Sequence, residues 1–392
     1  MKRTFKAAAL MTSVLLLTAV AAQAATIDIN LYGASAQYLF WNDAADNFLL
    51  SRGCTNVQQA EDSTKKHGIT RGTCGADTVY IRYSAKASYD GIYACKGEVP
   101  PGGQPNCSGQ GPRYREMADE TQTNFSTGVV NGLACKLVTI GASDVAGETF
   151  QQSSHGQLRG HLGGGHIDRT ISPVNTTGMT YYRPVIVPFG FFKNNTANPG
   201  LTNLTRLMAL MIFSGKAYNW SDFGPSYVNK DIIACLRHAG SGTHATLDAA
   251  VMRGDWPLVT YEDAPYVWFN DGAADEMRCI NENGGQSTAS YAAVGYADAD
   301  QSLTSYPNVA AVNYEGAPAQ KVHITNGVYS FWSAQWLYEC NPSDPVHHPW
   351  MVLLNAFAED PANLPASKAA FWATQSEMNV EKANDFAMPQ FK

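Results

Sequence analysis

The spacing of apolar and polar residues differs from one short segment of this chain to the next, and turn-forming residues separate the segments. Residues 26–32 alternate as in a strand, and residues 37–50 carry apolar side chains at helical spacing. The pattern predicts further strands at 78–83, 137–140, 185–188, 232–236 and around 294–296, and further helices at 204–213, 245–252, 348–357 and 367–377. Strands that alternate with helices favour an α/β architecture with partly parallel sheets.

Two long segments lack such periodicity and are rich in turn formers. Residues 95–113 are rich in Gly and Pro, and residues 155–177 are mostly polar with several glycines. We expect the first to be a loop and most of the second to be one as well.

The first 24 residues have the layout of a secretory signal. A basic start precedes an apolar stretch, residues 7–20, and Ala22-Gln23-Ala24 fits a small-residue cleavage site. No cysteine follows that site and no later apolar run is long enough to span a bilayer, so neither a lipid anchor nor a membrane span is expected. We therefore expect a periplasmic or secreted protein.

Charge and length restrict the function further. The chain has 27 basic and 34 acidic residues, and three of the basic ones lie in the signal segment. An acidic chain argues against a nucleic-acid partner. The 392 residues exceed one usual domain and suggest two.

Cysteine usage agrees with an oxidising compartment. All eight cysteines follow the signal segment, and none forms a Cys-x-x-Cys motif. We expect disulfides, and the sequence alone leaves 105 pairings open. The simplest pairs are Cys54 with Cys74 and Cys95 with Cys107, because both bracket polar, Gly- or Pro-containing stretches.

The segment Arg237-His238-Ala239-Gly240-Ser241-Gly242-Thr243 has the composition of an anion-binding turn. It connects an apolar predicted strand to a predicted helix. Its glycines let the backbone approach a ligand, and free N–H groups at a helix start favour negative charge. Arg237, Ser241 and Thr243 add donors suited to a tetrahedral oxyanion. The alternative is a plain strand–turn–helix joint in which Ser241 or Thr243 caps the helix.

A second turn, Gly141-Ala142-Ser143-Asp144, follows another predicted strand. A carboxylate that faces an oxyanion repels it unless the anion brings a proton. Hydrogen phosphate and hydrogen arsenate do so near neutral pH and sulfate does not, so Asp144 would select against sulfate. The alternative is that Asp144 caps a helix.

Several motifs resemble, in order, those of the phosphate-binding proteins of ABC importers. Gly33-Ala34-Ser35-Ala36-Gln37-Tyr38 resembles their Gly-Ala-Gly-Ala-Thr-Phe opening, and residues 141–144 resemble their Gly-Ala-Ser-Asp loop. Arg237 with residues 240–243 is similar to their Arg-x-x-Gly-Ser-Gly-Thr loop. Residues 201–222, with Ile212-Phe213-Ser214-Gly215-Lys216 and Trp220-Ser221-Asp222, and the segment Asn326-Gly327-Val328-Tyr329 also match. Residues 51–77, 95–133 and 150–180 look like additions.

The resemblance implies a type II periplasmic binding-protein fold. Each of its two lobes would be a mixed, mainly parallel sheet flanked by helices, and crossing strands would form a hinge. It implies a signal peptide at 1–24, a first lobe from 25–182, a second lobe from 183–322, and a return to the first lobe over 323–392.

The resemblance also implies the ligand-binding groups. Inorganic phosphate, or a similar protonated oxyanion such as arsenate, would be held by eight residues: Gln37, Tyr38, Ser88, Asp144, Arg237, Ser241, Gly242 and Thr243. Two departures stand out, since Gln37 replaces a threonine and Ala239 replaces an aspartate that pairs with the arginine. No catalytic residue, cofactor or metal is implied, and the protein partner would be an ABC importer permease.

Other interpretations stay open at this point. His155, His161 and His166 could bind a metal, but no carboxylate or thiolate lies at a standard ligand spacing. A phosphatase-like enzyme would use Ser241 with His238 or His244, yet the Gly-x-Ser-x-Gly elbow is missing. The third interpretation is an exported structural or adhesion protein on the same fold, in which the added segments would form the surface that binds a partner. Aromatic residues 266–269 and 329–338 are expected to pack in the core or hinge.

Overall fold

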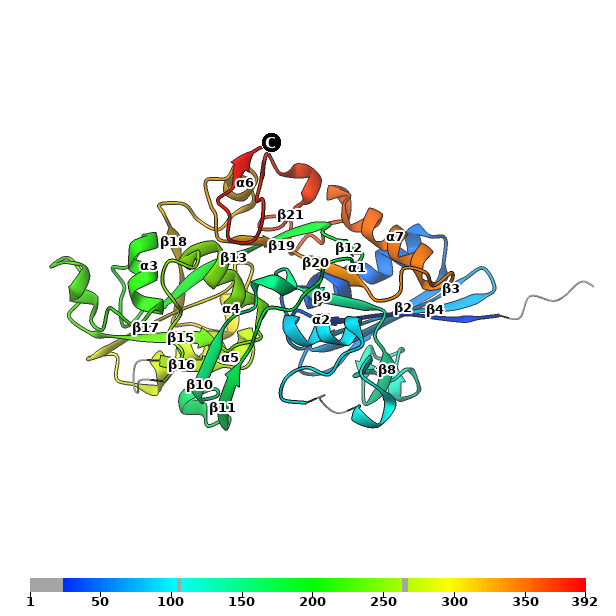
Figure 1. Ribbon diagram of the computed structural model, residues 1–392, viewed down its shortest axis with the longest axis horizontal. Coiled ribbons are helices and arrows are strands. Elements are labelled where there is room, and N and C mark those ends of the chain that lie inside the picture. Colours follow the sequence, from blue (N-terminus) through cyan, green and yellow to red (C-terminus); the bar gives the residue numbers. More distant parts are fainter. Residues whose placement is uncertain (1–23, 104–106, 263–266) are drawn as a thin grey trace, which may run out of the picture.

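The computed structural model describes residues 24–103, 107–262 and 267–392. The described chain forms two lobes, each around one large sheet (Figure 1). The predicted signal segment, apart from Ala24, lies outside the described residues, and so does Tyr266. Among the helices that the structure describes, none combines the length and apolarity that a membrane span requires.

The first lobe contains a nine-stranded sheet of order β12-β20-β9-β1-β4-β3-β2-β7-β6. Its strands are β1 (Thr26–Gly33), β2 (Thr55–Glu61), β3 (His67–Cys74), β4 (Asp77–Ala85), β6 (Thr123–Asn124), β7 (Val129–Val130), β9 (Ile140–Ser143), β12 (Tyr181–Tyr182) and β20 (Trp336–Glu339). The helices packed on it are α1 (Tyr38–Ser51), α2 (Ser88–Lys96) and α7 (His347–Ala358), and a separate pair is formed by β5 (Tyr114–Ala118) and β8 (Leu133–Leu137).

The second lobe contains an eight-stranded sheet whose main order is β14-β18-β13-β17-β15-β16. Its strands are β13 (Val185–Asn194), β14 (Asn203–Leu204), β15 (Asp231–Arg237), β16 (Val267–Asn270), β17 (Tyr291–Asp298), β18 (Val309–Tyr314), β19 (Trp332–Ala334) and β21 (Ala373–Thr374). Its helices are α3 (Arg206–Phe213), α4 (Gly242–Leu247), which continues as a π-helical turn over Asp248–Met252, α5 (Ala273–Asn281) and α6 (Lys321–Thr325).

The predicted α/β architecture is confirmed, and both sheets are mixed. Parallel pairs occupy the centre of the first sheet, where β1 lies between β4 and β9, and one side of the second sheet, where β15 lies between β16 and β17. The first sheet has more antiparallel strands than the alternating pattern predicts, because the hairpin β2–β3 and the strand β20 extend it on either side. A continuous apolar core runs through both lobes, from Leu31 in β1 to Leu236 in β15.

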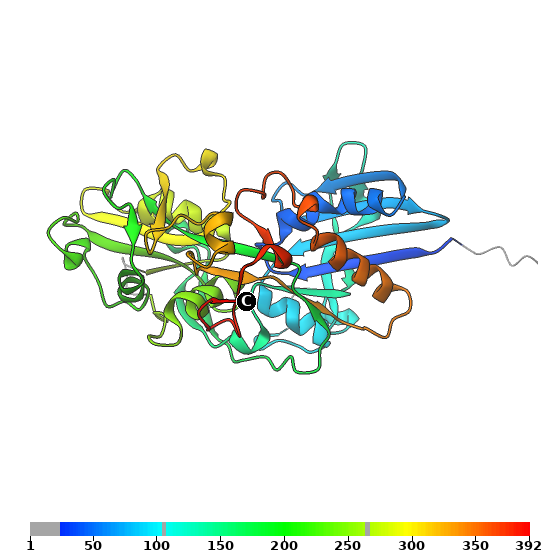
Figure 2. The same ribbon diagram turned by 90° about the horizontal axis from the view of Figure 1, so that it is seen from above.

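The chain crosses between the lobes at two neighbouring places. β13 follows β12 after two residues, and β20 follows β19 after Gln335, while β13 and β19 pair with each other. The C-terminal tail, with β22 (Val380–Glu381) and β23 (Gln390–Phe391), lies over this junction (Figure 2). Asp385 of the tail accepts hydrogen bonds from the Ala146 N–H and the Thr149 hydroxyl, both at 2.7 Å.

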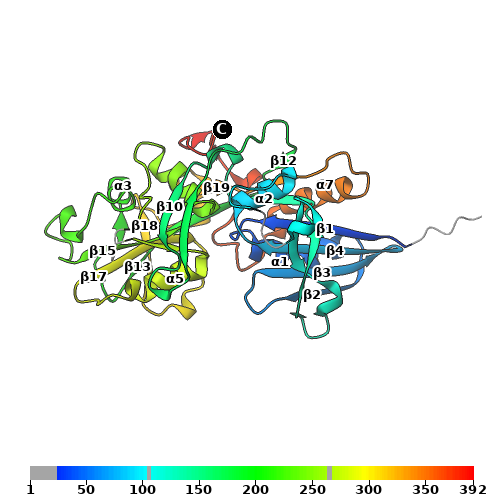
Figure 3. The ribbon, with the colours of Figure 1, turned by 60° about the horizontal axis from the view of Figure 1, so that its bottom comes forward.

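One secondary-structure prediction is incomplete and one is wrong. Most of residues 155–177 lies outside strands, as predicted, but β10 (Ser153–Gln157) and β11 (His166–Thr170) form a hairpin, seen in green in Figure 3. Backbone bridges to Tyr261 and Phe269 place this hairpin against the second lobe, so its strands are supported by packing that a periodicity count does not register. Residues 367–377 do not form the predicted helix, since Ala373–Thr374 pairs with β13 as β21.

The disulfide prediction is half right. Cys54–Cys74 is present and joins the end of α1 to the end of β3. The predicted Cys95–Cys107 pair is wrong, because Cys95 lies at the buried end of α2 beside the first sheet and bonds to Cys340. Cys107 bonds to Cys135, and Cys235 of β15 bonds to Cys279 of α5. Nearness in sequence is a poor guide where a helix carries a cysteine to a distant strand.

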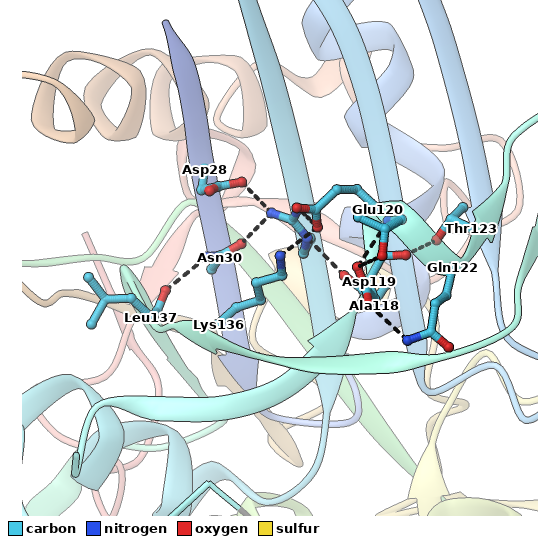
Figure 4. A network of polar contacts seen from close by, with 11 residues as sticks. Asp28, Asn30, Ala118, Asp119, Glu120, Gln122, Thr123, Lys136 and Leu137 are labelled. Carbon is cyan, nitrogen blue, oxygen red and sulfur yellow. Dashed lines mark hydrogen bonds and ion pairs between the residues drawn. The ribbon is translucent and has the colours of Figure 1, made fainter. Parts of the chain in front are cut away.

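A buried arginine anchors the β5–β8 segment to the first sheet (Figure 4). The guanidinium of Arg82 on β4 bonds Asp28 and Asn30 of β1, the Ala118 carbonyl oxygen and the Glu120 carboxylate. Lys136 of β8 pairs with the same Glu120 at 2.5 Å. The guanidinium is completely buried, so its N–H groups need local acceptors, and each of its three nitrogens has at least one in this network.

The Cys95–Cys340 bond yields the first prediction. It joins residues 245 apart in sequence, and replacement of both by serine should lower the free energy of unfolding by about 2–5 kcal/mol, measured by urea titration. Non-reducing peptide mapping should recover a Cys95–Cys340 peptide. Recovery of a Cys95–Cys107 peptide from native protein would contradict the arrangement.

Candidate functional site

Parallel strands of both sheets end at the junction of the lobes. β9, β1 and β4 run side by side in the first sheet, and β16, β15 and β17 in the second. The carboxyl ends of parallel strands lie at one edge of a sheet, which is where open α/β sheets bind ligands. Ser88, Asp144 and Arg237 lie at or shortly after such ends.

Ser88 and Asp144 form the first-lobe side of the candidate site. The backbone N–H of Asp144 donates to Ser88 Oγ at 3.2 Å, and this hydroxyl donates to Asp144 Oδ2 at 3.4 Å. Both residues are buried, and Asp144 Oδ1 has no partner among the described residues. The capping alternative for Asp144 is wrong, because the next helical turn, Gly147–Thr149, begins after Ala146.

Arg237 is the charged group on the second-lobe side. Its residue is 2% exposed, and its Nη2 donates to the Asp271 carbonyl oxygen at 3.0 Å. Nε and Nη1 have no hydrogen-bond partner among the described residues, and none of the ion pairs there includes Arg237. Buried N–H groups without acceptors are costly, so this arrangement favours an anion that accepts two parallel N–H bonds.

The turn after Arg237 supplies two hydroxyl groups. Ser241 caps α4, because its Oγ accepts from the His244 N–H at 3.4 Å, as the capping alternative predicts. Thr243 is buried and its Oγ1 has no partner among the described residues. Thr243 therefore remains available as a donor, whereas Ser241 Oγ already accepts one hydrogen bond and can still donate its own proton.

The two sides meet at Gly242. A Cβ atom at this position would lie 2.2 Å from Ser88 Oγ and 2.4 Å from Asp144 Oδ2. The Tyr89 N–H also donates across the junction to the Gly240 carbonyl oxygen at 3.3 Å. Glycine is thus required sterically for the lobes to close over the polar groups.

The electrostatics of the site are set by burial. Burial and the carboxylate of Asp298 together raise the pKa of Asp144 from its ordinary value of 3.8 to about 7, and Arg237 opposes this rise. Burial lowers the pKa of His244 to about 3, with His238 and Arg237 acting in the same direction. His244 is therefore neutral at physiological pH, and Arg237 carries the positive charge of the site.

Gln37 and Tyr38 lie at the start of α1, and their side chains are engaged elsewhere. Gln37 Nε2 donates to the Ser143 carbonyl oxygen at 3.1 Å, and Gln37 Oε1 accepts from Trp41 Nε1 at 2.9 Å. The Tyr38 N–H donates to the Ser35 carbonyl oxygen at 3.2 Å, within the turn before the helix. Ligand binding by the N–H groups of residues 37 and 38 stays a prediction.

The sequence interpretation missed two buried side chains near Asp144. Gln335, in the crossing segment between β19 and β20, lies close enough to Asp144 to lower its pKa. Asp298 is the last residue of β17 and is buried. An acidic residue directly after an apolar strand was the signal that indicated Asp144, and Val294-Gly295-Tyr296-Ala297-Asp298 carries the same signal. For Gln335, no such signal exists.

A polar cleft borders the site. Its volume is about 500 Å³, and both lobes line it. Ser35 and Ala36 border it from the first lobe, and Asp271 and Asp298 border it from the second. Several of its lining residues are thus neighbours of the residues that form the site.

The glycine-rich histidine segment makes ordinary polar contacts. His155 stacks on Tyr261 with ring centroids 4.7 Å apart, and its Nδ1 contacts Asp168 Oδ1 at 2.5 Å. His161 Nε2 contacts Glu282 Oε2 at 2.8 Å. Over residues 24–103, 107–262 and 267–392, no group of three or more His, Cys, Asp or Glu side chains is arranged to hold a metal ion.

Comparisons with known proteins find likeness in solved structures. No protein-family model and no curated protein matches the sequence. Similar structures include an ABC-type phosphate transport receptor from Vibrio cholerae (14% identity, 84% of this chain and 93% of that chain, TM-score 0.47). Others are a high-affinity periplasmic phosphate-binding protein, PfluDING (12%, 88% and 89%, 0.46), and a phosphate-binding protein from Stenotrophomonas maltophilia (12%, 80% and 78%, 0.41). Because these identities and TM-scores are low, support for the site comes from the side chains of this chain itself.

Gly242→Ala should prevent closure of the lobes while leaving each lobe folded. The added methyl group would meet Ser88 and Asp144 below contact distance, so the variant should show a larger radius of gyration in small-angle scattering with an unchanged circular dichroism spectrum.

Gly200→Ala is the matched control, since a Cβ atom there meets nothing within 4 Å. A Gly242→Ala protein as compact as the control would contradict the close approach at this position.

Proposed function

We propose that this protein captures inorganic phosphate, or a similarly protonated oxyanion such as arsenate, between its two lobes. Arg237 and Thr243 would bind the anion from the second lobe, together with Ser241 and the N–H groups of the α4 turn. Ser88 and Asp144 would bind it from the first lobe, and the N–H groups of Gln37 and Tyr38 would add to them. The predicted division into lobes at 25–182, 183–322 and 323–392 belongs to this proposal.

One observation carries the proposal. Among the described residues, two nitrogens of the buried Arg237 guanidinium and the hydroxyl of Thr243 have no partner, and the Asp144 carboxyl is close enough for Arg237 to lower its pKa. A set of donors facing one acceptor matches an anion that both accepts hydrogen bonds and donates one. Because Ala239 offers no carboxylate and instead donates its N–H to Ser154 Oγ at 2.9 Å, the charge of Arg237 is left for the ligand.

The site would discriminate between oxyanions by whether the anion carries a proton that it can donate. Ionised Asp144 accepts a hydrogen bond from hydrogen phosphate and repels sulfate, which has no proton to donate. In the buried site this repulsion is poorly screened.

The motif resemblance supports a role in uptake. An exported binding protein of this kind would release its ligand to an ABC importer permease, with the signal segment directing export. A structural or adhesion role on the same fold would need no anion affinity, so binding measurements separate the two.

A phosphatase-like activity finds no support in the histidine contacts. His244 Nδ1 contacts Tyr296 Oη at 2.6 Å, and His238 contacts the Ala239 carbonyl oxygen and Asp271. Neither imidazole is hydrogen-bonded to the hydroxyl of Ser241, which a general base for that nucleophile requires.

Arg237→Ala should abolish tight phosphate binding. Loss of two charge-assisted hydrogen bonds, each worth about 1.5–3 kcal/mol, should weaken affinity by roughly 10²–10⁴-fold in isothermal titration calorimetry. Arg52→Ala, at an exposed position after α1, is the control and should bind like wild type. Unchanged affinity in Arg237→Ala would exclude this site.

Asp144→Asn should narrow the preference for phosphate over sulfate. The amide removes the repelled charge and can donate to sulfate, so the ratio of the two affinities should fall by about 10–100-fold in competition titrations. Asp248→Asn is the control, because Asp248 is also buried with a raised pKa but accepts from Gln152 and Gln151 outside the site. An unchanged ratio in Asp144→Asn would show that Asp144 does not face the anion.

A further inference from the structure

Asp298 is a second buried carboxyl group at the same junction. It ends β17, which is parallel to β15, the strand that ends at Arg237. Its Oδ2 accepts from Gln301 Nε2 at 3.0 Å, and its Oδ1 is buried without a partner in the described part of the chain. Asp298 also lines the cleft that borders the site.

Asp298 acts on Asp144 from the opposite lobe. Asp298 raises the pKa of Asp144, and Arg237 lowers the pKa of both carboxyls. Tyr83 of β4 is influenced by both, since each of the two carboxylates raises the pKa of its phenol. Together with the adjacent strand ends of β15 and β17, these effects place the two carboxyl groups and the guanidinium in one electrostatic environment.

The other charged groups around Asp298 do not offset its charge, so the net charge of the site is negative when Asp144 and Asp298 are both ionised. Asp300 and Lys368 are an ion pair with each other. Glu276 of α5 accepts from the Tyr296 N–H at 3.1 Å, and burial raises its pKa well above the ordinary value, which favours its neutral form. Arg237 therefore faces two unpaired carboxyl groups, and an entering anion meets a net negative site when both are ionised.

We propose that Asp298 is a second proton-accepting group of the anion site, so that the closed site holds two protons, shared between the oxyanion and the two carboxyl groups. This inference rests on the proposed function and adds a specificity-determining residue to it. A dihydrogen anion brings both protons. A hydrogen dianion brings one, and the site then takes the second from solution.

The dependence on pH follows from this balance. Burial raises the pKa of Asp298 to about 6, and that of Asp144 to about 7, so both are ionised in the free protein above neutral pH. Phosphate is then mainly the hydrogen dianion. Uptake of one proton per ligand makes the association constant fall tenfold for each pH unit.

The test is phosphate titration of the full-length protein by calorimetry between about pH 7.5 and 8.5. Wild type should lose about tenfold in affinity over this unit, and Asp298→Asn should lose little, because one acceptor needs only the proton that the dianion brings. Asp248→Asn, the control introduced above, should follow wild type. Ligand ionisation is identical in all three proteins and cancels from the comparison.

The outcomes separate this inference from the function on which it rests. If no protein binds phosphate at any pH, the proposed function fails. If wild type and Asp298→Asn bind with equal pH dependence, only the role of Asp298 is overturned. Should Asp298→Asn not fold, titration of wild type in two buffers of different ionisation enthalpy should show uptake of about one proton per phosphate near pH 8, and uptake near zero would overturn the inference.

Discussion

Arg237 carries a full positive charge into the interior without an ion-pair partner in the described chain, and the junction of the lobes is organised around it. Its backbone N–H is held by Tyr296 Oη at 3.1 Å and its Nη2 by the Asp271 carbonyl oxygen, so the guanidinium is fixed at the end of β15. Burial raises the pKa of Asp144 and Asp298 and lowers that of His244, and the charge of Arg237 opposes the rise at both carboxyl groups.

Closure and recognition depend on the same few atoms. Gly242 allows the α4 turn to approach Ser88 and Asp144, and these are the first-lobe groups that an anion at Arg237 would contact. A ligand that bridges the lobes would therefore stabilise the closed arrangement by its differential affinity for it. The crossing strands and the C-terminal tail, which holds Ala146 and Thr149 through Asp385, fix the segment that follows Asp144.

The sequence was most informative where chemistry is local. Glycine, hydroxyl and charged residues directly after an apolar run indicated the turns at 141–144 and 237–243, and the structure places Asp144 and Arg237 in one buried environment. It was least informative where partners are distant in the chain. Cys95 bonds to Cys340, and the 153–170 hairpin packs on the second lobe, because tertiary contacts support both and no local pattern records them. Asp298 directly follows an apolar run, which is the pattern that indicated Asp144, whereas Gln335 lies in a crossing segment where no sequence pattern marks it.

The α/β alternation, the strand–turn–helix joints and the residue types at their ends can be read from the order of residues, since they follow from hydrophobic period and turn chemistry. Which of those ends meet is a property of the folded chain. The shifted pKa values of Asp144 and Asp298, the absence of an ion pair at Arg237 among the described residues and the need for glycine at 242 all arise from burial and from close approach of groups separated by many residues. Such properties depend on the dielectric surroundings and on distances, which the order of residues does not contain.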